Sequence, residues 1–117
     1  SLAQVSGHTA LIADRDQFIA VSGGSKNLLG KGLSGELEDK INNRETLIAS
    51  KGERSFIQVS SDGGEDFSHI AISPIICEGD VIGAVVLAEG DEKSKMGEVE
   101  QKLVLSAAGF LGRQMEQ

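Results

Sequence analysis

The fold of this chain is decided by residues 69–89, HIAISPIICEGDVIGAVVLAE, in which two β-branched runs flank a short acidic turn. Gly79 in that turn can adopt a positive φ without steric cost, so the stretch predicts a β-hairpin. The second arm is apolar for eight residues, 81–88, as a strand is when both of its faces are covered. Since a two-stranded ribbon is not stable alone, the rest of the chain must cover both faces.

Short apolar runs elsewhere predict further strands and helices around this hairpin. Ser34 is a suitable N-cap for a middle helix, whose apolar residues Leu33, Leu37 and Ile41 recur every fourth position. The apolar run 46–49 is too short to assign to a helix or a strand. The predicted strands are 9–13, 18–22 and 55–59, and the predicted helices are the last turns of one at 2–7, one at 34–43 and one at about 95–116.

The short connections between these strands set the fold class. Three of them have the length of hairpins or short loops, so we expect an α+β domain with a mostly antiparallel sheet. The terminal helices should pack on one face, and the middle helix with its loops on the other. Residues 1–117 fit a single domain. Because the chain starts with Ser1 and with what resembles the end of a helix, we expect a further domain upstream.

Composition excludes several classes of function. A net charge of −7 and the absence of Trp and Tyr argue against a nucleic-acid surface, so any contact with DNA should come from another segment or chain. One Cys and two His allow neither an internal disulfide nor a structural zinc site, and we predict no metal and no cofactor. Without a signal peptide or an apolar run of about 20 residues, the chain reads as a cytoplasmic protein with no membrane contact.

The side chains of the first hairpin arm alternate between a bulky apolar face and a small or polar face that includes His69 and Ser73. We expect the bulky face to meet the terminal helices and the other face to line a pocket under the middle helix. The alternative is that these polar side chains are satisfied members of the core. The candidate ligand contacts are Ser22, Ser25, Phe56, Gln58, His69 and Ser73.

No group of residues predicts catalysis. Cys77 lies beside Glu78 and Asp80, whose negative charges should raise the pKa of the thiol and weaken it as a nucleophile. The chain has no Gly-x-Ser-x-Gly motif, and the glycines of residues 23–32 miss the spacing of a phosphate-binding loop. We therefore predict that the chain is not an enzyme.

The final helix carries two lines of apolar residues, although a helix on a single sheet needs only one. One line contains Met96, Val99, Leu103, Ala107 and Phe110. The surplus predicts association of the terminal helices into a homodimer or homotetramer, and a wide core stripe within a monomer is the alternative. The candidate interface combines the second line with two residues of the first helix: Leu2, Val5, Val104, Ala108, Leu111 and Met115.

Residues 73–87 combine Pro-Ile, a turn and Ile-Gly-x-Val, and this run resembles the hairpin of the GAF domain family, ligand-sensing relatives of PAS domains. Together with 7–16, 22–26 and 107–116, it makes the whole chain similar to the GAF domains of AbrB-like sporulation transcription regulators. The chain departs from two better-known GAF branches, because it lacks the Asn-Lys-x-Phe-Asp-Glu pattern of cyclic-nucleotide binders and the cysteine that attaches bilins.

The resemblance implies a GAF/PAS-like sheet and a non-enzymatic regulatory domain. It also implies a DNA-binding domain upstream of this sequence as the sole contact with DNA, and through it activation or repression of sporulation genes. An unknown small molecule would be sensed, and the terminal helices would assemble the oligomer. The alternative function is a purely structural dimerisation module with no ligand.

Overall fold

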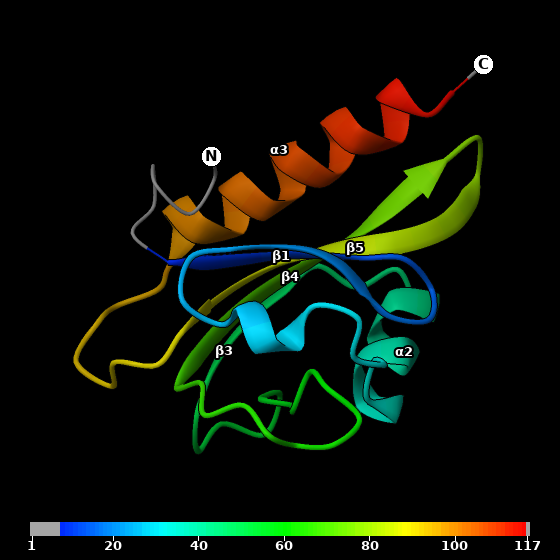
Figure 1. Ribbon diagram of the computed structural model, residues 1–117. Coiled ribbons are helices and arrows are strands. Elements are labelled where there is room, and N and C mark those ends of the chain that lie inside the picture. The colour runs from blue at the N-terminus through cyan, green and yellow to red at the C-terminus, as the bar shows by residue number, and fades with distance from the viewer. Residues whose placement is uncertain (1–7, 117) are drawn as a thin grey trace.

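The computed structural model describes residues 8–116, and in these residues the chain forms one antiparallel sheet with a long helix on one face (Figure 1). The strand order is β2-β1-β5-β4-β3, so the predicted hairpin forms the centre of the sheet. The predicted α+β class is confirmed. The elements are β1 (Thr9–Ala13), β2 (Phe18–Ser22), the short 3₁₀ helix η1 (Lys26–Leu28), α2 (Gly35–Asn42), β3 (Leu47–Ser50), β4 (His69–Cys77), β5 (Asp80–Glu89) and α3 (Glu98–Gln114).

The β4–β5 hairpin turns at two residues that both have a positive φ, 52° at Glu78 and 86° at Gly79. This is the backbone of a type I′ turn, whose twist matches that of the flanking strands. Further along β5, Gly83 lies so close to β1 that a Cβ atom there would overlap the carbonyl oxygen of Ala13. Glycine at this position therefore lets β1 pair with β5.

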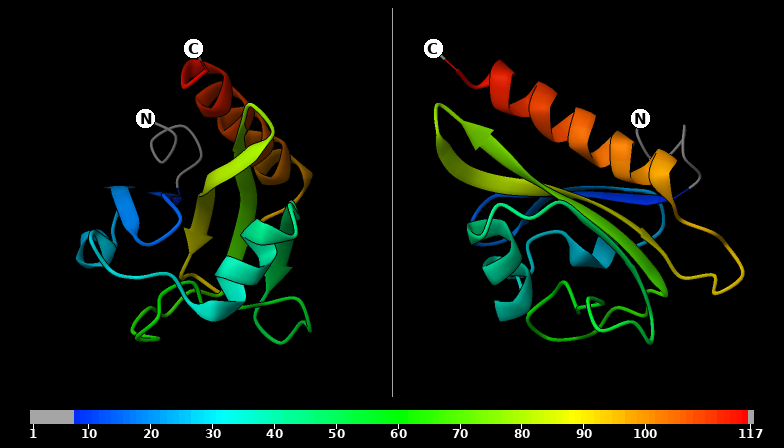
Figure 2. Two further views of the ribbon diagram at one scale, coloured as in Figure 1. Left: turned by 90° about the vertical axis from the view of Figure 1, so that its right-hand side faces the viewer. Right: turned by 180° about the vertical axis from the view of Figure 1, so that it is seen from behind.

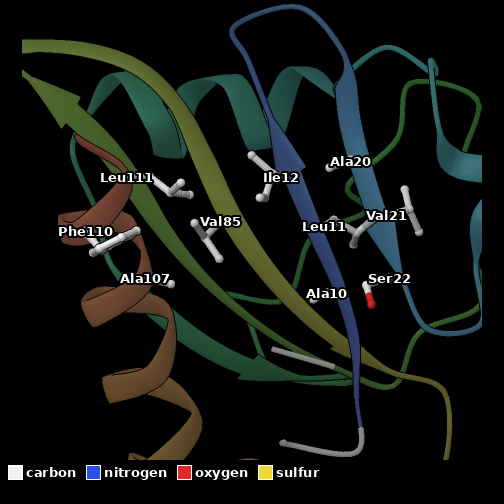
Figure 3. A pocket seen from close by; sticks show the side chains of 10 residues that line it. All are labelled: Ala10, Leu11, Ile12, Ala20, Val21, Ser22, Val85, Ala107, Phe110 and Leu111. Carbon is white, nitrogen blue, oxygen red and sulfur yellow. The ribbon is translucent and has the colours of Figure 1, made fainter. Parts of the chain in front are cut away.

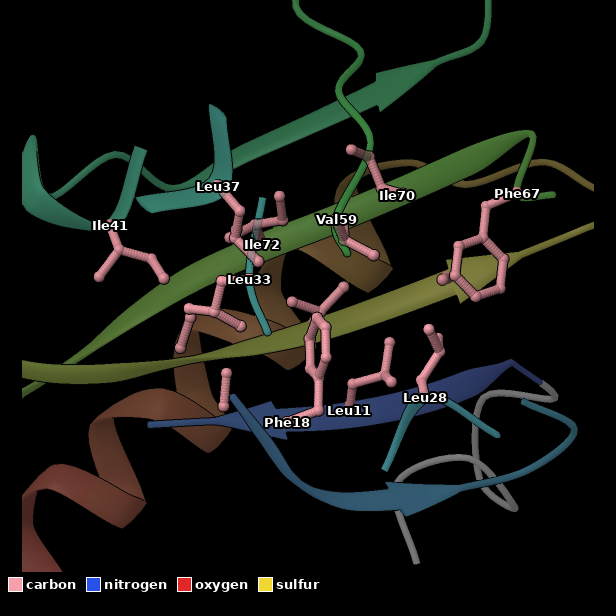
Figure 4. Close-up of a cluster of buried hydrophobic side chains, with 14 of the residues drawn as sticks. Leu11, Phe18, Leu28, Leu33, Leu37, Ile41, Val59, Phe67, Ile70 and Ile72 are labelled. Carbon is pink, nitrogen blue, oxygen red and sulfur yellow. The ribbon is translucent and has the colours of Figure 1, made fainter. Parts of the chain in front are cut away.

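Two separate hydrophobic clusters cover the two faces of the sheet. Figure 2 shows α3 on one face, and α2, η1 and the loops on the other. On one face, Val104 and Ala108 of α3 pack on β4 and β5. On the other face, Leu37 of α2 and Leu28 of η1 are fully buried among side chains from the strands and the long loop before β4 (Figure 4). The predicted division between the final helix on one face and the middle helix with its loops on the other is confirmed.

The structure corrects the prediction of which way the first hairpin arm faces. Ile70 and Ile72 belong to the cluster under α2 and the loops, whereas Ala71 belongs to the cluster under α3. Because side chains alternate along a strand, His69 and Ser73 share the α3 face with Ala71. Alternation in the sequence separates the two sets of side chains, but it does not tell which helix or loop packs on each set.

One predicted strand is also wrong. Residues 55–59 form part of an irregular loop, and the third strand of the sheet is β3, from the run that the sequence left unassigned. The polar backbone groups of the loop find partners outside the sheet: the carbonyls of Gln58 and Val59 accept hydrogen bonds from Ser34, and the Val59 N–H donates to Glu65. The predicted first helix lies outside the described residues.

The loop between β3 and β4 is held by the carboxylate of Asp62. Its oxygens lie 2.8 Å from Nζ of Lys31 and 2.9 Å from the backbone N–H of Gly64. These two hydrogen bonds, with a third from the Ser60 hydroxyl, lower the pKa of Asp62 from 3.8 to about 2.

α3 is held in register by Gly112, because a Cβ atom at that position would overlap the carbonyl oxygen of Ile76 in β4. We expect Gly112→Ala to destabilise the fold by about 1–3 kcal/mol, since the helix must shift away from the strand. Gly109→Ala in the same helix is the matched control, because its Cβ would meet only the flexible end of Arg113. The control should be neutral or more stable by up to about 1 kcal/mol. Urea unfolding that ranks the two variants in the opposite order would contradict this packing.

Asp62 should make the stability of the fold depend on acid pH. Its carboxyl has a lower pKa in the folded chain, so its stabilising effect is present above 3.8 and is lost as the pH falls toward about 2. Asp62→Asn should therefore flatten the curve of unfolding free energy against pH between these two values. Urea titrations at a series of acid pH values measure this slope, and an equal slope in the variant would contradict the assignment.

Candidate functional site

The structure does not bring the six predicted ligand contacts together. Ser22, His69 and Ser73 lie on the α3 face, whereas Phe56 packs against the opposite core and Ser25 precedes η1. The sixth, Gln58, lies in the irregular loop with Phe56. The space expected to be a pocket under the middle helix is filled by side chains with no exposed surface: Leu28, Leu37, Ile70, Ile72 and Phe18. The location predicted for the pocket is wrong.

The polar side chains of β4 have partners within the fold. Nδ1 of His69 lies 2.7 Å from the Ser50 hydroxyl, and Nε2 lies 3.1 Å from the carbonyl oxygen of Glu92. The hydroxyl of Ser73 is buried, 3.0 Å from that of Thr46. These contacts fit the alternative in which His69 and Ser73 are satisfied polar groups of the fold.

The Ser50–His69 pair does not make a catalytic triad. The second ring nitrogen of His69 faces a backbone carbonyl instead of the carboxylate that orients the base in such a triad. Cys77 is unsuited to nucleophilic chemistry, because burial and the carboxylates of Glu78, Glu116 and Asp80 raise the pKa of its thiol. Within residues 8–116, no three His, Cys, Asp or Glu side chains are placed to hold a metal ion.

A groove of about 300 Å³ lies on the α3 face, between α3 and the β1–β2 edge of the sheet (Figure 3). It exists because α3 crosses β4 and β5 and leaves the β1–β2 side of this face uncovered. Ser22 is the one polar residue among those that line it. The lining residues are Ala10, Leu11, Ile12, Ala20, Val21, Ser22, Val85, Ala107, Phe110 and Leu111.

The flank of α3 beside this groove continues the apolar surface. Val99 is 66% exposed and Phe110 is 55% exposed. Val99, Leu103 and Phe110 lie within about 40° of one another around the helix axis. Phe110 follows Val99 by eleven residues and Leu103 by seven, and both spacings are close to whole numbers of helical turns. We call Val99, Leu103, Ala107 and Phe110 the α3 flank, and the flank and the groove form one apolar surface.

This arrangement exchanges the roles predicted for the two apolar lines of the final helix. Val104 and Ala108, expected at an interface, are 0% and 2% exposed against the sheet. Leu111 is half-buried at the groove, and Met115 is 60% exposed near the end of α3. Leu2 and Val5, the other two predicted interface residues, lie outside the described part of the chain. The α3 flank was visible in the sequence as the first apolar line, but the helical pattern alone cannot say which line meets the sheet.

Within residues 8–116, no helix has the length and apolar character needed to cross a membrane.

Sequence comparison connects this chain to sporulation proteins. The sequence model of the family described as Stage V sporulation protein T C-terminal, transcription factor, matches residues 1–116. Stage V sporulation protein T of Bacillus subtilis (strain 168) is 46% identical over 112 residues, which cover 95% of this chain and 61% of that protein. The chain therefore spans less than two thirds of the length of this relative.

Solved structures with the same fold are distant in sequence. The GAF domain of an Acinetobacter phosphoenolpyruvate-protein phosphotransferase matches with a TM-score of 0.74 at 17% identity, covering 96% of this chain and 74% of that one. The cofactor-binding GAF domain of the nutrient sensor CodY from Clostridium difficile matches at 0.65 and 13% identity, covering 97% and 79%. A type II free methionine-R-sulfoxide reductase from Thermoplasma acidophilum matches at 0.65 and 11% identity, covering 90% and 76%.

At these identities the structural matches establish the fold alone, and that fold is found both in binding domains and in an enzyme. They confirm the GAF resemblance read from the hairpin. Because the family match extends over residues 1–116, the chain belongs to the family of Stage V sporulation protein T C-terminal domains and has the fold of a GAF domain.

Proposed function

We propose that this chain is the non-enzymatic regulatory domain of a sporulation transcription regulator in the cytoplasm, and that it self-associates through the α3 flank and the groove. The observation that carries this proposal is the apolar surface formed by the groove and the α3 flank, which no other described part of the chain covers. Contact with DNA would come from a domain outside this sequence. The net charge of −7 suits a domain that stays away from the phosphate backbone.

A second copy of the same chain is the occupant that the residues of α3 favour. If two α3 helices pack antiparallel about a two-fold axis, Val99 of one copy meets Phe110 of the other, and Leu103 meets Ala107. The midpoint of each pair falls within one residue of position 105, so one antiparallel alignment of the two helices forms both pairs. An interface of this kind uses the same patch on both copies. The small side chain of Ala107 would let the second helix approach the groove.

Leu2 and Val5 stay predicted contributors to this contact. If both copies add them, the helix pair would become a helical bundle, and a homotetramer is the larger assembly predicted from the sequence.

The α3 flank can be tested by one charge substitution with a control on the same helix. Phe110→Glu should convert a dimer of twice the 12.3 kDa chain mass into a monomer, because it would bury a carboxylate in an apolar contact. Leu105→Glu is the matched control, since Leu105 is also 55% exposed but lies about 140° away around the helix. Light scattering after gel filtration, at tens of micromolar chain, measures the masses.

Two results would contradict the proposed surface. A wild-type chain that is monomeric at this concentration would remove self-association as a property of this domain. A dimer that survives Phe110→Glu but dissociates with Leu105→Glu would move the interface to the other side of α3.

Small-molecule sensing is the second part of the proposed function. The alternative is a purely structural module without a ligand, and the filled core under α2 favours that alternative. Sensing predicts that one metabolite in a thermal-shift screen stabilises the chain by about 2.7 kcal/mol at 100 times its Kd, which raises Tm by several degrees. The double variant His69→Ala/Ser73→Ala should abolish that shift if the polar residues of β4 contact the ligand. A folded dimer without any hit would support the structural module.

A further inference from the structure

A small polar pocket lies between the β1–β2 turn and α2, away from α3 and the groove. Its volume is about 130 Å³. Since a water molecule in the liquid takes about 30 Å³, the pocket has room for about four waters or for a ligand of similar size. The residues that line it are Arg15, Asp16, Glu38, Ile41 and Asn42.

Contacts within the fold shape both walls of this pocket. In the β1–β2 turn, Oδ1 of Asp14 accepts the backbone N–H groups of Asp16 and Gln17, each at 2.8 Å. On α2, Glu38 and Asn42 are four residues apart, so they lie on the same face of the helix. The walls are therefore set in advance, which lowers the cost of ordering them when a ligand binds.

Part of the lining offers hydrogen-bond donors. Nη2 of Arg15 donates to Oδ1 of Asn42 at 3.0 Å, and Nη1 donates to the carbonyl of Val81 at 3.4 Å. These two contacts orient the guanidinium and use two of its five N–H groups, so three remain. Because the oxygen of the Asn42 amide faces Arg15, its NH₂ group is also left to donate. Several N–H donors beside a positive charge make a favourable site for a carboxylate.

The rest of the polar lining offers negative charge. The carboxylates of Asp16 and Glu38 line the pocket, and none of the ion pairs between described residues includes either of them or Arg15. The lining thus holds one positive and two negative charges that do not pair with one another. An ammonium group brings a positive charge and three N–H donors, which suit two carboxylates.

A ligand that satisfies both sets of groups must carry a carboxylate and an ammonium group only a few bonds apart. We propose that the pocket binds a small α-amino acid. Its carboxylate accepts hydrogen bonds from Arg15 and Asn42, and its ammonium group donates to Asp16 and Glu38. The volume restricts the ligand to the smallest side chains, such as those of glycine, alanine and serine.

Binding follows from the pocket alone, but a sensing role for it rests on the proposed function. The pocket shares no lining residue with the groove or the α3 flank. A bound amino acid would bridge α2 and the turn that joins β1 to β2, and these two strands line the groove. Ligand binding would therefore stiffen the part of the sheet on which we propose that the second copy packs.

Titration of the isotope-labelled 117-residue chain with L-alanine, followed by the NMR shifts of its backbone amides, tests the site. We expect saturable shifts confined to residues 14–17 and 38–43, with a millimolar Kd because the charges are partly exposed to solvent. Acetate and methylammonium each carry one of the two charges and should bind on the order of tenfold more weakly. L-leucine should also bind more weakly than L-alanine, since its side chain exceeds the pocket.

Two glutamates of α2 provide a matched pair of variants. Glu38→Gln should weaken alanine binding on the order of tenfold, because it removes a charged acceptor. Glu36→Gln is the control and should leave binding unchanged, since Glu36 lies about 160° away around the helix. Phe110→Glu should also bind alanine as the wild type does, which separates a failure of this site from a failure of self-association.

Two results would overturn the proposal. Alanine that binds no better than acetate or methylammonium would make the pocket a site for a single charge. Full affinity for alanine in Glu38→Gln would show that the ammonium group does not bind at this carboxylate.

Discussion

The whole structure depends on the burial of both faces of the β4–β5 hairpin. Its strands carry fully buried aliphatic side chains in two opposite clusters, so the helices and loops cover its two faces while β1, β2 and β3 extend the sheet at its edges. Two glycines allow the closest contacts: Gly83 admits β1 beside β5, and Gly112 seats α3 on the carbonyl of Ile76. Because α3 is seated over β4 and β5, it cannot also cover β1 and β2. The groove is thus a consequence of how the core is built.

Local patterns in the sequence were sufficient for most of the fold. A Gly in an acidic turn predicted the hairpin, and the structure shows the positive φ values that this turn needs. Ser34 was predicted to cap the middle helix, and its hydroxyl accepts the N–H of Leu37 at 3.0 Å. The strands β1 and β2 have the predicted bounds. Each of these features depends on neighbours within a few positions, so the residues themselves carry the information.

The errors concern choices that only tertiary packing settles. Alternation along β4 separated two faces, and either face could have met a helix. In the structure the bulky face with Ile70 and Ile72 meets α2 and the loops, and the other face meets α3, which reverses the prediction. The same ambiguity arose in α3, where Val104 rather than the α3 flank turned out to face the sheet. Residues 55–59 look like a strand but bond to Ser34 and Glu65 instead. The six predicted ligand contacts failed to converge because their grouping relied on these face assignments.

We propose that two copies of α3 pack antiparallel, and disulfide trapping between copies distinguishes this arrangement from a parallel pair. In a Cys77→Ser background, chains carrying Val99→Cys are mixed with chains carrying Phe110→Cys under mild oxidation. Antiparallel packing predicts a disulfide between Val99→Cys of one chain and Phe110→Cys of the other, with little cross-linking of either chain alone, because like positions lie more than 10 Å apart along antiparallel helices. Strong cross-linking of Val99→Cys to itself, without a disulfide to Phe110→Cys in the mixture, would show parallel helices and rule out the antiparallel pair.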